Sequence, residues 1–139
     1  RRSVEAIFRE DGEAAFRKLE AELTPKLVAS ERLVFSPGGG WITNPRLFDG
    51  LPPDTLTVWL KASPGTILAR ISGPKEQPMR PLLAGEDARE RAEELLRIRT
   101  PLYSRAALAI DTDRLSVAEV TREILKIVRP ERGNAEGSV

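Results

Sequence analysis

Residues 55–71, which read TLTVWLKASPGTILARI, decide the fold class of this chain. The first part, 55–61, is rich in the Thr, Val, Leu and Trp residues that favour a strand. Ser63 and Pro64 follow as an N-cap and a proline at the first helical position, and they predict a helix to about Ile71. A strand that runs directly into a helix is the repeating unit of α/β proteins with a parallel sheet.

The alternation of strand and helix continues on both sides of this unit. Apolar periodicity and capping residues predict helices at 3–10, about 13–29, 63–71, 87–100 and 116–128, and strands at 33–36, 55–61 and 108–112. We expect Pro25 to kink or divide the second helix and Pro101 to end the fourth. A capping box of Ser116 and Glu119 is expected to begin the last helix. Three strands indicate a parallel α/β domain, although sheets commonly have about five or six.

The composition bounds the class of protein. The length of 139 residues predicts one domain, and 40% hydrophobic with 31% charged residues is typical of a folded, soluble chain. The sequence has no Cys and no His, which excludes disulfides, thiolate zinc sites and histidine bases. Its apolar runs are too short to span a membrane, and a net charge of +1 does not favour nucleic-acid or membrane binding. These features therefore predict a soluble domain without nucleic-acid or membrane partners.

Arginine dominates the basic residues, with 17 Arg and 5 Lys among the 22. The planar guanidinium forms forked hydrogen bonds to carboxylates and phosphates. The excess of arginine therefore favours small anions as ligands.

The ends of the chain and one internal segment carry further expectations. The only Met is Met79, and the sequence opens at Arg1 without the apolar core of a signal peptide, so we expect the natural N-terminus to be missing. Residues 72–86 combine three Pro and two Gly with little periodicity, which predicts a long loop that could act as a lid. Residues 129–139 predict a disordered tail after a domain at 1–128.

Two glycine-rich or loop motifs could carry chemistry, and each also has a plain structural interpretation. Gly38, Gly39 and Gly40 follow a predicted strand, where glycines let a ligand approach the backbone closely or simply form a flexible turn. They are not a Walker A loop, because no Gly-Lys-Ser/Thr follows. Arg80 lies in the lid-like loop, where it would suit closure over a phosphate or would only be solvated.

Two predicted helices contribute further candidates. Arg17 and Glu20 have the i, i+3 spacing of an ordinary exposed ion pair. Arg97, Arg99 and Tyr103 surround the end of another helix, where a cation also complements the helix dipole. Taken alone, both sets are explained by their effect on the helices.

Taken together and in this order, the motifs resemble those of the shikimate kinases. The resemblance covers about residues 2–128 and rests on 3–8 (SVEAIF), 11–20 (DGEAAFRKLE), 38–40 (GGG), 80–85 (RPLLAG), 99–103 (RTPLY) and 111–113 (DTD). It implies a P-loop fold like that of nucleoside-monophosphate kinases, with three layers around a parallel sheet. It also implies transfer of the γ-phosphoryl group of ATP, with Mg²⁺, to the 3-hydroxyl of shikimate. An enzyme of this kind is expected to be a cytoplasmic monomer whose partners are shikimate and ATP.

The resemblance assigns an acceptor site to the first and last thirds of the chain. Arg17 and Arg99 match the two arginines that clamp the shikimate carboxylate, and Glu20 matches an acidic residue that orients the clamping arginine. Gly39 and Gly40, with Gly38 beside them, match the glycines that contact the ring hydroxyls.

On the nucleotide side, the resemblance assigns Arg80 to the transferring phosphates as a catalytic residue, and Arg70 and Arg114 to the adenine. The Walker A loop of the family, with its Mg²⁺-binding hydroxyl and its lysine, has no counterpart here, and neither does the aspartate that contacts the shikimate hydroxyls. Both would precede Arg1, together with a central strand between 33–36 and 55–61. We therefore expect a truncated domain that is inactive alone.

One substitution and two other functions stay open. Trp41 stands where the family usually has a small residue, and it could narrow or reshape the acceptor pocket. The chain could instead be a non-catalytic module that binds a metabolite or acts as a scaffold. It could also be a related small-molecule kinase, such as a gluconate kinase.

Overall fold

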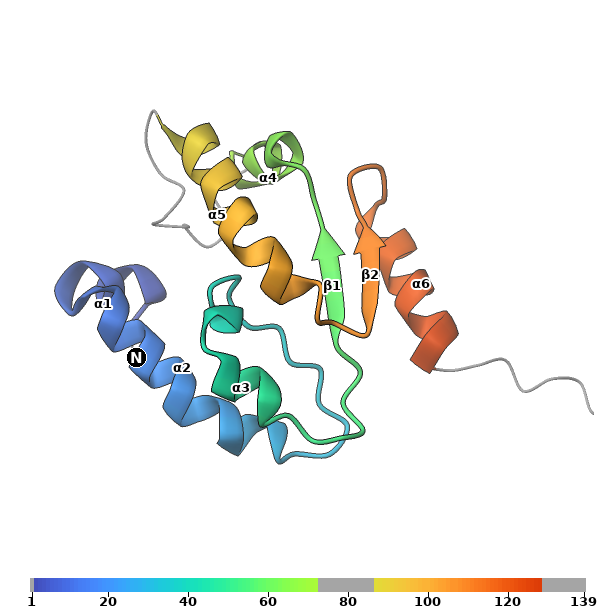
Figure 1. Cartoon of the computed structure of the whole chain (residues 1–139), viewed down its shortest axis with the longest axis horizontal. Helices are drawn as coiled ribbons and strands as arrows, with labels where there is room; N and C mark the ends of the chain where they lie inside the picture. Colours follow the sequence, from blue (N-terminus) through green and yellow to red (C-terminus); the bar gives the residue numbers. More distant parts are fainter. Residues whose placement is uncertain (1, 73–86, 129–139) are drawn as a thin grey trace, which may run out of the picture.

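Two parallel strands, β1 (Val58–Lys61) and β2 (Leu108–Asp111), form the sheet in a computed structural model that describes residues 2–72 and 87–128 (Figure 1). The register places Val58 opposite Leu108 and Lys61 opposite Asp111. One further backbone hydrogen bond continues the ladder at each end, from Leu108 N to Thr57 O and from Thr112 N to Lys61 O. The predicted parallel α/β arrangement is therefore confirmed for these two strands.

Helices connect and cover the strands. The chain leaves β1 into α4 (Pro64–Ile71) and returns to β2 through α5 (Ala88–Tyr103), which packs against α4. After β2, α6 (Val117–Val128) lies beside the sheet on the side away from α5 (Figure 1). The predicted N-caps of α4 and α6 are both present, because the Ser63 hydroxyl accepts from Thr66 N and Ser116 exchanges hydrogen bonds with Glu119.

The chain begins with two consecutive helices, α1 (Val4–Glu10) and α2 (Gly12–Val28). Ser3 caps α1, as the sequence predicts, by accepting a hydrogen bond from Ala6 N. Gly12 has a φ of 82°, a left-handed conformation that glycine adopts without steric cost, and this turn lets α2 follow α1 directly. The rings of Phe8 and Phe16, 4.9 Å apart, join the two helices.

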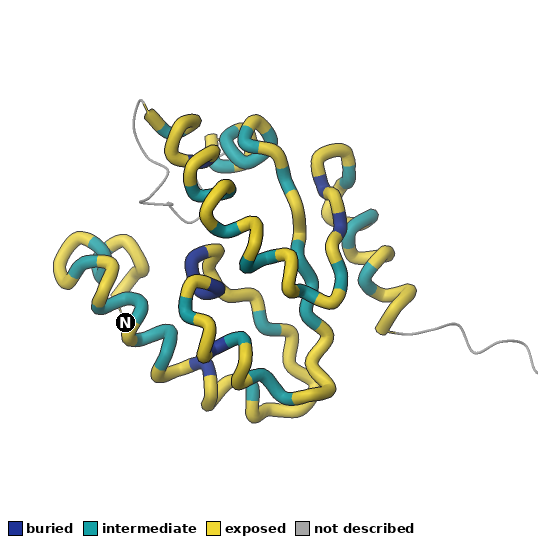
Figure 2. The backbone as a smooth tube through the Cα atoms, in the orientation of Figure 1, coloured by how far each residue is buried: buried dark blue, intermediate teal, exposed yellow. Residues whose placement is uncertain are grey.

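The small hydrophobic core lies between α2 and α5, which contribute Ala21 on one side and Leu102 and Tyr103 on the other. It is built by the single-turn helix η1 (Trp41–Thr43) and by α3 (Pro45–Asp49), which bury Trp41, Ile42 and Leu47. The buried segment stands out on the backbone in Figure 2. Because η1 directly follows Gly40, this core fixes the position of the glycine segment.

One predicted strand is wrong. Residues 33–36 form no strand, and the side chain of Val34 is 94% exposed. A strand needs a neighbour to take its backbone hydrogen bonds. In the part of the chain that the structure describes, β1 pairs with β2 only, and no other strand lies beside 33–36. An apolar sequence run was therefore not sufficient to form a strand.

Both proline predictions are corrected in part. Pro25 lies inside α2, which is a single helix and is not divided. Pro101 does not end α5, which continues to Tyr103. Proline removes one N–H donor, but Ser104 N still donates to Thr100 O and Arg105 N to Leu102 O, so the last turn closes around it.

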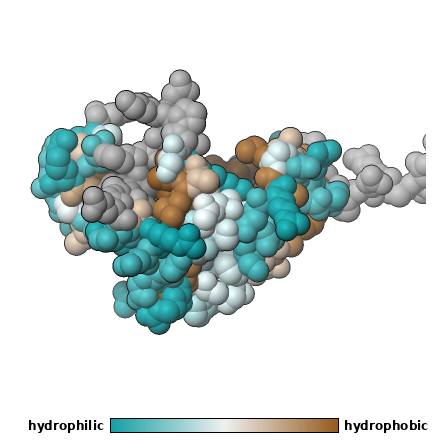
Figure 3. Space-filling view, turned by 90° about the horizontal axis from the view of Figure 1, so that it is seen from above, coloured by the Kyte–Doolittle hydropathy of each residue, from teal (hydrophilic) through white to brown (hydrophobic). Residues whose placement is uncertain are grey.

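Several expectations fall outside the described residues or concern exposed surface. The proposed lid at 72–86 lies almost wholly outside them, as does the tail at 129–139. No helix among the described residues combines the length and apolar character needed to cross a membrane. Apolar patches alternate with hydrophilic surface on the face drawn in Figure 3. Large apolar side chains remain exposed at β1, among them Leu60 within the strand and Leu56 just before it.

Candidate functional site

The glycine segment Gly38–Gly40 lies between α2 and α5, with Glu20 and Arg17 on one side and Tyr103 and Arg99 on the other. Its three carbonyl oxygens are all used within the protein. Gly38 O accepts from Trp41 N, Gly39 O from the Tyr103 hydroxyl, and Gly40 O from the backbone and hydroxyl of Thr43.

The three glycine amides, unlike the carbonyls, have no hydrogen-bond partner among the described residues. Within residues 2–72 and 87–128 the N–H groups of Gly38, Gly39 and Gly40 donate to no acceptor. Backbone donors without a partner bind ligand oxygens readily, as in other backbone anion and hydroxyl sites. The segment therefore offers donors, while its acceptors are already occupied.

Arg17, on α2, is held by two carboxylates on its own helix. Its Nε and Nη2 donate to Glu13 Oε1 at 3.2 and 2.8 Å, and its Nη1 donates to Glu20 Oε2 at 2.5 Å. Burial lowers the pKa of Arg17, but the hydrogen bonds and charges of Glu20 and Glu13 outweigh it and shift that pKa upward. The guanidinium thus stays charged with a fixed orientation.

The Arg17 guanidinium lies against the backbone of Gly40 and leaves no room for a side chain there. A Cβ at this position would lie 2.8 Å from Nη1 and 2.5 Å from Cζ of Arg17, both too close. Gly39 has a similar but looser environment, since its Cβ would lie 3.0 Å from the Tyr103 hydroxyl and 3.6 Å from Nη1 of Arg99. Two arginines from different helices therefore converge on adjacent glycines.

Arg99, on α5, differs from Arg17 in its charge environment. It is half-buried, and no carboxylate in the described part of the chain forms an ion pair with it. Its helix neighbour Arg97, by contrast, is exposed and forms a forked pair with Glu94. The fork of Arg99 is consequently available to an outside anion, whereas that of Arg97 is not.

Trp41 is buried, although it directly follows the glycine segment. Its side chain belongs to the core, where its indole N–H donates to the Thr24 hydroxyl at 2.9 Å and its ring meets Phe35 edge-on at 5.9 Å. The expectation that it narrows a pocket is therefore replaced by a structural role, as a link between η1 and α2.

Two of the remaining predicted residues, Arg70 and Arg114, lie near the end of β2. Arg70, on α4, donates to the hydroxyl and carbonyl oxygens of Thr112 at 2.9 and 2.5 Å, so it joins α4 to the end of β2. Arg114 is exposed just beyond that point. Arg80 lies outside the described residues. The structure therefore brings together Arg17, Glu20, Arg99 and the glycines, whereas Arg70 and Arg114 lie at the end of β2.

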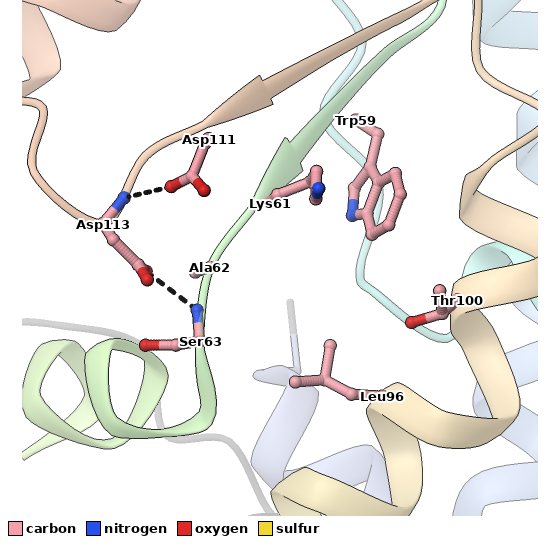
Figure 4. A pocket seen from close by; sticks show the side chains of 8 residues that line it. All are labelled: Trp59, Lys61, Ala62, Ser63, Leu96, Thr100, Asp111 and Asp113. Carbon is pink, nitrogen blue, oxygen red and sulfur yellow. Dashed lines mark hydrogen bonds between the residues drawn. The ribbon is translucent and has the colours of Figure 1, made fainter.

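A cavity of about 330 Å³ lies at the carboxyl ends of the two strands (Figure 4). Its lining residues are Trp59, Lys61, Ala62, Ser63, Leu96, Thr100, Asp111 and Asp113. Asp113 accepts a hydrogen bond from Ser63 N at 2.8 Å, and this backbone bond is the main cause that holds the pKa of Asp113 below its ordinary value. Ligands of α/β proteins commonly bind at this edge of the sheet.

The sequence is similar to those of known proteins over almost its whole length. The family model described as shikimate kinase matches residues 1–129 of this chain. The chain belongs to the shikimate kinase family. The predicted P-loop kinase fold class is likewise confirmed by its structural neighbours.

Individual shikimate kinases give the extent of the similarity. That of Chlorobaculum tepidum is 39% identical over 140 residues, which cover 92% of this chain and 72% of that protein. For a shikimate kinase of Thermus thermophilus the identity is 40%, over 89% of this chain and 66% of that protein. The solved shikimate kinase of Acinetobacter baumannii, in complex with shikimate, matches with a TM-score of 0.82 and 28% identity, covering 94% of this chain and 72% of that one.

Some residues of the site were missed by the sequence interpretation. Glu13 has the i−4 spacing that would have identified it as a partner of Arg17. The lining of the cavity comes from the ends of both strands, a position that the predicted sheet already marked. The bond from Trp41 to Thr24 spans 17 residues and had no local signal.

We predict that Gly40→Ala displaces the Arg17 guanidinium without unfolding the protein, because the added Cβ meets only the end of a flexible side chain. The Arg17 Nε–Hε resonance should move toward that of a free arginine, and the free energy of unfolding should fall by at most about 1 kcal/mol, the scale of a part-exposed ion pair. Gly65→Ala is the control, since its Cβ would meet nothing within 4 Å. An unchanged Arg17 resonance in Gly40→Ala would contradict this account of the glycine.

Proposed function

We propose that the complete product of the gene encoding these residues transfers the γ-phosphoryl group of ATP to the 3-hydroxyl of shikimate. The observation that carries the proposal is the convergence of Arg17 and Arg99, from two helices, on the segment Gly38–Gly40. Membership of the shikimate kinase family supports it. A cytoplasmic, monomeric enzyme without nucleic-acid or membrane partners is part of the same proposal.

The two arginines suit one carboxylate. A guanidinium has five N–H donors, and Arg17 uses three of them on Glu13 and Glu20, which leaves two for a ligand. Arg99 has no carboxylate partner among the described residues. Forked, charge-assisted hydrogen bonds contribute about 1.5–3 kcal/mol each, and together they would fix both the position and the rotation of the acceptor.

The glycine segment would bind the hydroxyl side of the acceptor. Its unused amides donate to hydroxyl oxygens, and Gly39 and Gly40 are the two positions that the family resemblance assigns to this contact. Glu20 would hold Arg17 in place rather than touch the acceptor, since it already accepts from Nη1. The site thus separates a carboxylate end from a hydroxyl end.

The nucleotide side rests on the family resemblance alone. Arg80 would reach the transferring phosphates, and Arg70 and Arg114 would contact the adenine side. Phosphoryl transfer depends on positioning and charge stabilisation, which suits arginine. The family implies Mg²⁺. Among the described residues, no group of three or more acidic, His or Cys side chains could hold a metal ion.

The first test is an assay of ATP-dependent phosphorylation of shikimate by the complete gene product, beside the isolated 139 residues. We expect activity only in the former, because the 139 residues contain no Gly-x-x-x-x-Gly-Lys-Ser/Thr segment for the phosphates. Gluconate serves as the competing acceptor. A gene product that contains such a segment but phosphorylates gluconate, or nothing, would refute the proposal.

The second test removes the arginines one at a time. Arg17→Ala and Arg99→Ala should each weaken shikimate binding by at least about tenfold, because each loses charged hydrogen bonds, and should leave ATP binding nearly unchanged. Calorimetry of both ligands measures this. The matched control is Arg97→Ala, which removes the same charge from the exposed side of the same helix. Unchanged shikimate affinity in either site variant would exclude the carboxylate clamp.

A further inference from the structure

Trp41, the residue after the glycine segment, is linked to α2 by two consecutive hydrogen bonds. The indole N–H of Trp41 donates to the Thr24 hydroxyl at 2.9 Å, and that hydroxyl donates to the backbone oxygen of Glu20 at 2.7 Å. Trp41 is only 6% exposed and Thr24 only 3%. Water is therefore a poor competitor for either bond.

This fastening acts on the face of α2 that carries the site. Arg17, Glu20 and Thr24 have i, i+3 and i+7 spacing, so they lie along one side of the helix. The carbonyl that Thr24 holds belongs to Glu20, the residue whose carboxylate orients Arg17. Trp41 follows Gly40 directly, so its bond sets the distance between Gly40 and that face.

A second fastening joins the same segment to α5. The Tyr103 hydroxyl donates to Gly39 O at 2.5 Å, and Arg99 lies one turn earlier on the helix. The Tyr103 ring stacks on Trp59 of β1, with centroids 5.6 Å apart and planes 29° apart. The Lys61 ammonium lies over the Trp59 ring, 5.3 Å from its centre. Tyr103 is thus fixed against the sheet as well.

We propose that Trp41 and Tyr103 are positioning residues that hold Arg17 and Arg99 at the separation required by one carboxylate. This inference rests on the proposed function. Neither residue touches the acceptor. Trp41 acts through α2 on Arg17, and Tyr103 acts through Gly39 and α5 on Arg99.

Two variants remove the Trp41 bond in different ways. Trp41→Phe removes the donor but keeps an aromatic ring, and Thr24 Oγ1 can still donate to Glu20 O. Thr24→Val keeps the side-chain shape but leaves the indole N–H buried without an acceptor, which costs more stability. A positioning role predicts that both variants raise the KM for the acceptor equally. A purely structural role predicts that the rise in KM follows the loss of stability.

The experiment measures the kinetics of the complete gene product. In Trp41→Phe, Thr24→Val and Tyr103→Phe the KM for shikimate should rise about fivefold, as expected for the loss of one hydrogen bond, while the KM for ATP and kcat stay within about twofold. The double variant Trp41→Phe with Thr24→Val should have the same KM for shikimate as either single variant, because both substitutions remove the same hydrogen bond. Ser116→Ala is the control, since it removes the capping box of the remote helix α6 and should lower stability without changing either KM.

Two results would overturn the inference. One is an unchanged KM for shikimate in Trp41→Phe and Tyr103→Phe, and the other is a rise in KM that follows the loss of stability across all variants, Ser116→Ala included. If the wild type lacks activity on shikimate, the proposed function fails. The positioning of the two arginines is then tested separately, by NMR of their side chains. In that case the Nε–Hε resonance of Arg17 must shift in Trp41→Phe, and that of Arg99 in Tyr103→Phe. Unchanged resonances would refute the positioning.

Discussion

The close approach of the Arg17 guanidinium to the backbone of Gly40 is the contact on which the site depends. It is possible only without a Cβ, since even the first side-chain carbon would overlap the guanidinium. The contact brings a helix that is distant in sequence onto the glycine segment, and Arg99 approaches the neighbouring Gly39 from the other side. Three consecutive glycines thereby become a surface shared by two cations.

Arg17 and Arg99 carry like charges beside the same glycine segment, so they would repel each other. Carboxylates of the described residues neutralise one of them and not the other. Arg17 is paired with Glu13 and Glu20, which keep it charged and oriented. Arg99 has no carboxylate partner among the described residues, so the uncompensated positive charge lies on the α5 side. An incoming carboxylate would therefore find one arginine already oriented and one still in need of an anion. This asymmetry combines a defined geometry with a net attraction.

The sequence predicted those parts of the fold that depend on neighbouring residues. Ser3, Ser63 and Ser116 begin helices because each hydroxyl accepts from the amide three residues ahead, and the pair of Arg17 with Glu20 follows from helical spacing. Residues 33–36 were predicted as a strand and are not one, because strand formation requires a partner that sequence patterns do not supply. The prediction that Pro101 ends α5 placed the end of the helix too early. The hydrogen bonds that close its last turn are donated by Ser104 and Arg105, beyond the proline.

The site itself was less accessible from sequence. The family resemblance selected Arg17, Arg99 and the glycines, but only the structure shows that they meet, because Gly39 and Tyr103 are 64 residues apart. Trp41 illustrates the limit most clearly. As a bulky residue beside three glycines it suggested a narrowed pocket, whereas its bond to Thr24 across 17 residues turns the ring into the core. Long-range hydrogen bonds of this kind have no local pattern.

The central claim is that Arg17 and Arg99 share one carboxylate. The most direct measurement follows the Nε–Hε resonances of both arginines while the complete gene product is titrated with shikimate and, separately, with its methyl ester. The account predicts that both resonances shift with the same dissociation constant for shikimate, and that the uncharged ester binds at least about tenfold more weakly. Equal binding of acid and ester, or saturation by shikimate with either arginine unmoved, would contradict it.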